Sequence, residues 1–185
     1  MMTMLSLWEN YCNTIYAEAH LRKLDMTPSE VLGYLIAGLC GEAEECWSEH
    51  CAWNSRSEPM DPDQVVVRLR AELGDALWYF GMIDRFARDT YSVQATWPDP
   101  ALDIEFRTSS NALGHVRPVN LMGSACRVAE ALKRPLRARP LDTRRTVAAL
   151  SSCASSFVQV ARHVGGLAAI MEENTAKYRR VYGIG

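Results

Sequence analysis

Residues 31–50, VLGYLIAGLCGEAEECWSEH, form one stretch in which an apolar half precedes an acidic half. The apolar half, VLGYLIAGLC, is typical of a helix that is buried in a protein core. The acidic half carries four glutamates within the eight residues 42–49. This stretch therefore predicts a helix that is buried in its first half and carries carboxylates on its surface in its second half. The groups that interact with these carboxylates must come from other parts of the chain.

Helical periodicity continues through nearly every segment on either side of this stretch. Thr27-Pro28-Ser29-Glu30 supplies a capping box with a proline at the first helical position, and Asp61-Pro62 repeats the cap-and-proline signal. The predicted helices cover residues 4–23, 28–52, 62–90, 118–137 and 143–182, the last with a break near Gly165-Gly166. We expect an all-α fold, a bundle of about five helices in a single domain, 1–185.

Composition narrows the range of partners. The chain of 185 residues has a formal net charge of −2 and no broad basic surface, so no nucleic-acid partner is expected. The first residues, MMTMLSLWENYCNTIY, fit neither a signal peptide nor a membrane span, so we expect no membrane partner and a cytoplasmic location. Six cysteines without a CxxC pair predict reduced thiols in the core.

The acidic residues follow the helical repeat on two neighbouring helices. Glu42 and Glu45 are three residues apart and share one face of the second predicted helix. Glu72 and Asp75 repeat this spacing on the third, with Tyr79 one turn further on the same stripe. Because two helices joined by a short turn run antiparallel, we expect the two pairs to face each other across a cleft.

Four carboxylates held together would repel one another, and burial would raise their pKa values unless a cation neutralised them. Mg²⁺ suits such a site because it accepts oxygen ligands from carboxylates, water and substrate phosphates. An isolated acidic pair is usually a solvated helix surface, as in a non-catalytic helical interaction protein. A di-iron protein would need Glu-x-x-His motifs, which neither pair provides.

At this point the sequence resembles the MazG-like, all-α nucleoside triphosphate pyrophosphohydrolases. Their ExxE motif matches Glu42-Ala-Glu-Glu45, and after a 26-residue spacer their ExxD motif matches Glu72-Leu-Gly-Asp75. The Asn-x-x-Lys-x-x-Arg motif that the family often carries matches 174–180. The resemblance covers residues 31–86 and 165–182, whereas 94–140 matches nothing.

The resemblance implies hydrolysis of a nucleoside triphosphate to the monophosphate and pyrophosphate. It implies Mg²⁺, with Mn²⁺ as a substitute, bound by four ligands: Glu42, Glu45, Glu72 and Asp75. Glu45 and Glu42 are the expected catalytic residues, with Glu45 as the base for the attacking water. The expected substrate-binding residues are Tyr79, Asn174, Lys177 and Arg180. Lys177 and Arg180 would hold the β- and γ-phosphates, although both are also ordinary positive charges at a helix C-terminus.

Specificity and assembly follow from the resemblance alone. Phage members of the family trim purine deoxynucleotides, so we expect dGTP or GTP as substrate, and the host cytoplasm if the chain is phage-encoded. A deoxyuridine triphosphatase of the same acidic-helix superfamily is the alternative. Family members are dimers or tetramers, so a homodimer or homotetramer is expected.

The second half of the chain aligns faintly with the first. GLCGEAEECWS aligns with GSACRVAEALK and RAELGDALWYF with VAALSSCASSF, which places Arg127 on Glu42 and Ser152 on Asp75. This alignment predicts a degenerate helical hairpin at about 118–182, beside catalytic helices at about 28–90, and so one active site per chain. The alternative is that two apolar helices align this well by chance.

Overall fold

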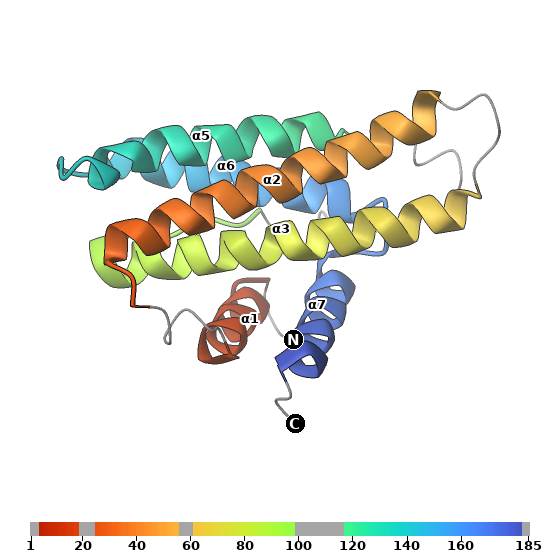
Figure 1. Cartoon of the computed structure of the whole chain (residues 1–185), viewed down its shortest axis with the longest axis horizontal. Coiled ribbons are helices and arrows are strands. Elements are labelled where there is room, and N and C mark those ends of the chain that lie inside the picture. Colours follow the sequence, from red (N-terminus) through yellow and green to blue (C-terminus); the bar gives the residue numbers. More distant parts are fainter. Residues whose placement is uncertain (1–3, 19–24, 56–60, 99–116, 183–185) are drawn as a thin grey trace.

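The computed structural model describes residues 4–18, 25–55, 61–98 and 117–182. These residues form helices joined by turns and irregular segments, without a strand among them, so the all-α prediction is confirmed for this part of the chain (Figure 1). The helices are α1 (Met4–Glu18), α2 (Pro28–Ser55), α3 (Pro62–Tyr91), α5 (Pro118–Leu136), α6 (Thr143–Ala161) and α7 (Leu167–Tyr182).

The helix starts form where the sequence predicts them. The backbone N–H of Thr27 donates to the Glu30 carboxylate at 2.7 Å, and that of Glu30 donates to Oγ1 of Thr27 at 3.4 Å. This is the predicted capping box of α2. At the start of α3, Asp61 accepts from the backbone N–H of Asp63 at 3.1 Å and Pro62 follows as the first helical residue.

The predicted fifth helix is divided into α6 and α7, so the described residues contain six helices rather than about five. Gly165 and Gly166 have φ values of 112° and 92°, which most residues with a Cβ avoid. The chain therefore breaks at the predicted glycine pair, and α7 takes a new direction. The predicted first helix agrees with α1 as far as residue 18, and its last residues lie outside the described ranges.

Helices α2, α3, α5 and α6 form the main bundle. Helix α2 packs against both α3 and α5, and α5 packs against α6, while α1 and α7 pack against α3 (Figure 1). The colours of Figure 1 show that α2 and α5 run in opposite directions. Phe80 of α3 and Phe157 of α6 meet in the core, with ring centroids 5.3 Å apart. The bundle thus consists of two helical hairpins that share one core.

A buried aspartate fixes α1 to this bundle. Nε1 of Trp8 donates to Asp84 at 2.8 Å, and the backbone N–H of Ala95 donates to the same carboxylate at 2.7 Å. Burial raises the pKa of Asp84, although both hydrogen bonds oppose that rise. Asp84 therefore holds together α1, α3 and the segment that follows α3.

The cysteines are all free thiols, but they are not all in the core. Cys12, Cys46 and Cys153 are buried, whereas Cys126 is exposed. The prediction of core thiols is wrong for Cys126. In the described residues, no helix is both long enough and apolar enough to span a bilayer.

Candidate metal and phosphate site

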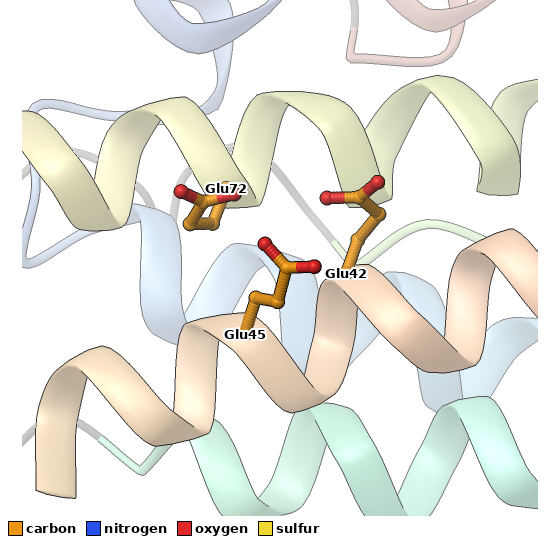
Figure 2. Close-up of side chains that lie close together, drawn as sticks. All are labelled: Glu42, Glu45 and Glu72. Carbon is orange, nitrogen blue, oxygen red and sulfur yellow. The ribbon is translucent and has the colours of Figure 1, made fainter.

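Three of the four predicted metal ligands lie together between α2 and α3. One carboxylate oxygen from each of Glu42, Glu45 and Glu72 lies within 4.8 Å of the other two. Glu42 and Glu45 project from α2 and Glu72 projects from α3, so the three side chains share the space between the two helices (Figure 2). Glu45 is exposed, and the other two are partly buried. The helical spacing of the acidic residues therefore brings carboxylates from two helices to one place.

The cluster is electrostatically strained in the absence of a cation. Burial, followed by the charges of Asp75, Glu45 and Glu72, raises the pKa of Glu42 to about 7. Burial and the charges of Glu45 and Asp75 also raise the pKa of Glu72. Lys177 opposes both shifts with its positive charge. The neighbouring carboxylates thus make Glu42 and Glu72 harder to ionise.

Asp75, the fourth predicted ligand, lies outside this group of three. Its carboxylate accepts hydrogen bonds from Nδ2 of Asn174 at 3.2 Å and from Nζ of Lys177. The Asp75 side chain is only 18% exposed, whereas that of Lys177 is 46% exposed. Asp75 is therefore ion-paired with Lys177 of α7, while its negative charge still raises the pKa values of Glu42 and Glu72.

Asn174 is buried and connects three helices. Its Oδ1 accepts a hydrogen bond from the Tyr11 hydroxyl of α1 at 2.7 Å, while its Nδ2 donates to Asp75. Gly74 allows this approach, because a Cβ added there would lie 3.2 Å from Nδ2 of Asn174. The sequence motifs did not assign Tyr11 or Gly74 to the site. A glycine inside a helical pattern, directly before Asp75, is the sequence feature that could have indicated that another side chain approaches the backbone of α3 there.

Tyr79 lies beside the cluster and packs directly on the α2 backbone. A Cβ added to Gly38 would lie 2.2 Å from the Tyr79 ring, so only glycine leaves room for the ring. The Tyr79 hydroxyl lies 3.4 Å from the hydroxyl of Tyr34, which is 44% exposed. Burial, followed by the hydrogen bond with Tyr34, raises the pKa of Tyr79. Tyr79 is thus half-buried beside the site, and its hydroxyl stays protonated at physiological pH.

The basic residues of α7 are placed differently from each other. Lys177 reaches Asp75, and Tyr178 beside it stacks on Trp78 of α3 with ring centroids 5.2 Å apart. Arg180 is exposed one turn beyond Lys177, and no described residue forms an ion pair with it. The structure therefore brings Asn174 and Lys177 to the carboxylates and leaves Arg180 at the solvent-facing end.

Comparison of the chain with models of protein families, with curated proteins and with solved structures gave no significant match. The resemblance to the MazG-like enzymes therefore rests on the sequence motifs alone.

Proposed function

We propose that the α2–α3 hairpin binds Mg²⁺ and hydrolyses a nucleoside triphosphate between its α- and β-phosphates. The observation that carries this proposal is the convergence of Glu42, Glu45 and Glu72 from two helices, with their oxygens within 4.8 Å. A cationic side chain, Lys177, lies close enough to both helices to lower the pKa values of Glu42 and Glu72. One substrate can thus reach both the carboxylates, which would bind a metal cation, and the ammonium group of Lys177, which would bind a phosphate.

The three carboxylates fit a hard divalent cation. In an octahedral Mg²⁺ site with bonds of about 2.1 Å, opposite ligand oxygens lie about 4.2 Å apart. The 4.8 Å limit of the cluster is close to this span, and glutamate side chains at the protein surface can rotate. A bound cation would also relieve the repulsion that raises the pKa of Glu42 to about 7. When bound, Mg²⁺ would neutralise phosphate charge and lower the pKa of a coordinated water.

The residues of the chain then have distinct roles in the proposal. Glu42, Glu45 and Glu72 hold the cation, and Asp75 completes the set of four carboxylates in a position that Asn174 fixes. Glu45, the exposed member of the cluster, is the proposed base, because it can reach the solvent water that attacks the α-phosphorus. Tyr79 limits the site on the side of Gly38 and borders the nucleotide.

The α7 side chains hold the leaving group. Lys177 exchanges Asp75 for the β- or γ-phosphate when substrate binds, since a phosphate carries more negative charge than one carboxylate. Arg180 binds the terminal phosphate with two parallel hydrogen bonds from its guanidinium. A homodimer or homotetramer is proposed as the assembly.

A panel of nucleoside triphosphates with Mg²⁺ tests the proposal. Chromatography or ³¹P NMR should detect the monophosphate and pyrophosphate in equal amounts, and Glu72→Gln should abolish both products. Guanine nucleotides, dGTP and GTP, are the proposed substrates, whereas a preference for dUTP would assign the chain to the deoxyuridine triphosphatases. Diphosphate and orthophosphate as products would contradict cleavage between the α- and β-phosphates. If no triphosphate is hydrolysed, the proposed enzyme activity is wrong.

A further inference from the structure

The second hairpin contains a polar pocket that the proposed catalytic function does not use. The pocket has a volume of about 290 Å³ and lies between α5 and α6. Its lining includes Asn120, Gly123, Arg127, Ser152, Ser156 and Gln159. Because one water occupies about 30 Å³ in the liquid, this volume admits a phosphate or pyrophosphate ion together with several waters. We call it the Arg127 pocket.

The lining of the Arg127 pocket favours an anion. Nη2 of Arg127 donates to Oγ of Ser152 at 3.1 Å, which aims the guanidinium across the pocket and leaves its other N–H groups available. Asn120 and Gln159 add side-chain amide donors, and no acidic residue belongs to the lining within the described part of the chain. Planar guanidinium groups match the oxygens of phosphate with paired hydrogen bonds.

In the alignment of the two hairpins, the Arg127 pocket overlaps the position of one member of the carboxylate cluster, Glu42, whereas the residues aligned with Glu45 and Glu72 lie outside its lining. The alignment of the two halves pairs Arg127 with Glu42, Gly123 with Gly38 and Ser152 with Asp75. It also pairs Phe80 with Phe157, and these two rings are in contact in the core. Between its two antiparallel helices, the first hairpin thus carries Glu42 and Asp75 where the second carries Arg127 and Ser152.

Glycine keeps the pocket open in the second hairpin. A Cβ added at Gly123 would meet nothing closer than Nη1 of Arg127, at 3.7 Å. At the aligned position in the first hairpin, the Tyr79 ring fills the space above Gly38, whereas Ser156 takes the place of that ring in the second. The volume that a tyrosine fills in one groove is therefore free in the other.

We infer that the Arg127 pocket is a non-catalytic binding site for a phosphate-bearing anion. The guanidinium of Arg127 pairs with the phosphate oxygens, and the amides of Asn120 and Gln159 donate further hydrogen bonds. The bound anion is either free phosphate or pyrophosphate, or the phosphate group of a nucleotide. This site needs no divalent cation and is independent of the activity proposed above.

Isothermal titration calorimetry in the presence of EDTA tests this site, because the chelator prevents metal-dependent binding at the carboxylates. Phosphate, pyrophosphate and GMP are titrated separately into the full chain in a buffer free of other phosphates. All three should bind. Tighter binding of GMP than of phosphate would identify a nucleotide as the ligand, and equal or weaker binding would identify the free anion.

Three variants locate the binding. Arg127→Met should weaken pyrophosphate binding about tenfold or more, because a charge-assisted hydrogen bond is lost. Arg134→Met removes the same charge from an exposed position on the same helix outside the lining, and it should bind as the wild type does. Gly123→Leu keeps the charge of Arg127 but fills the pocket, so it should also lose binding.

The variants remain interpretable because they should fold. Arg127 is exposed, and leucine has a higher helix propensity than glycine at position 123. Melting temperatures at or above that of the wild type would confirm this for Gly123→Leu. The inference is overturned if none of the three anions binds the wild type at millimolar concentration. It is equally overturned if Arg127→Met and Gly123→Leu bind pyrophosphate as tightly as the wild type.

Discussion

The side-chain amide of Asn174 donates to Oδ1 of Asp75 at 3.2 Å across 99 residues of sequence. The oxygen of the same amide accepts the Tyr11 hydroxyl at 2.7 Å. Because a carboxylate oxygen accepts, Asp75 requires the Nδ2 end of the amide to face it, and the Tyr11 hydroxyl donates to the oxygen at the other end. A hydroxyl on α1 therefore helps to hold in place a group that contacts the candidate metal site.

Removal of that hydroxyl tests this role. Tyr11→Phe should lower the free energy of unfolding by roughly 0.5–1.5 kcal/mol, since a buried amide oxygen loses its donor. Without this donor the Asn174 side chain is held less firmly against Asp75, so the variant should also gain less stability from added Mg²⁺. Urea unfolding with and without Mg²⁺ measures both effects. Tyr34→Phe is the control at a more exposed hydroxyl, and equal effects of the two variants would contradict this role of Tyr11.

The raised pKa of Glu42 predicts a pH-dependent stability of the metal-free protein. The pKa of about 7 in the folded state exceeds the ordinary value of 4.5, so the unfolded chain ionises first as the pH rises. Stability should therefore fall between these two pH values and stay level above them. Glu42→Gln should match the wild type below this window and exceed its stability above it by about 1 kcal/mol, a figure reduced for solvent screening.

Urea unfolding in EDTA across this pH range checks the prediction. The comparison with Glu42→Gln isolates this carboxyl group, since Asp84 also has a raised pKa and titrates in both proteins. Added Mg²⁺ should stabilise the wild type and have a much smaller effect on the variant, because a ligand stabilises a protein only through its affinity for the folded state. A stability difference that is the same at every pH would show that the charge of Glu42 is not its cause.

The contact between Gly38 and Tyr79 predicts an unusual cost for adding a methyl group. Gly38→Ala would place a Cβ 2.2 Å from the Tyr79 ring, so the ring must leave its position. We expect a loss of about 1–3 kcal/mol of stability together with reduced nucleotide turnover. Gly33→Ala, where the added Cβ meets nothing within 4 Å, should be neutral or stabilising by up to about 1 kcal/mol.

A double variant shows whether the ring is the cause. Tyr79→Ala removes the obstructing atoms, so Gly38→Ala should cost little in that background. Thermal unfolding of the four proteins of this cycle gives the coupling between the two positions. Additive effects of the two substitutions would mean that the methyl group at position 38 disturbs something other than Tyr79.

The proposed phosphate contact of Arg180 is tested by a change that preserves charge. Arg180→Lys should lower kcat/KM by about tenfold, because the paired hydrogen bonds of a guanidinium are lost although the positive charge remains. Arg179→Lys is the matched control, since Arg179 borders the groove between α1 and α7 instead. Steady-state kinetics with Mg²⁺ and dGTP compares the two. Equal turnover by both variants would remove Arg180 from the phosphate site.

Local signals made most of the helical architecture predictable. Capping residues and prolines mark the starts of α2 and α3, and Gly165-Gly166 marks the break before α7. The i, i+3 spacing was enough to bring Glu42 and Glu45 toward Glu72, because it depends only on helix geometry and on a short turn between helices.

The parts that sequence analysis missed depend on packing between distant segments. Tyr11 meets Asn174 only because α1 and α7 dock on the same helix, and no periodicity encodes that contact. The position of Asp75 outside the group of three reflects its contacts with Asn174 and Lys177 of α7, which no spacing within α3 encodes. The Arg127 pocket likewise requires the relative placement of α5 and α6, although the alignment already placed an arginine where the other hairpin has Glu42.

The ion pair of Asp75 with Lys177 has a consequence for synthesis on the ribosome. These residues are 102 positions apart, so at roughly 5–20 residues per second Lys177 emerges about 5–20 s after Asp75. During that interval the carboxylates of the nascent α2–α3 hairpin lack the ammonium group of Lys177. If Mg²⁺ binds as proposed, it neutralises them in the meantime, and folding of this hairpin during translation should then depend on the ion before the chain is complete.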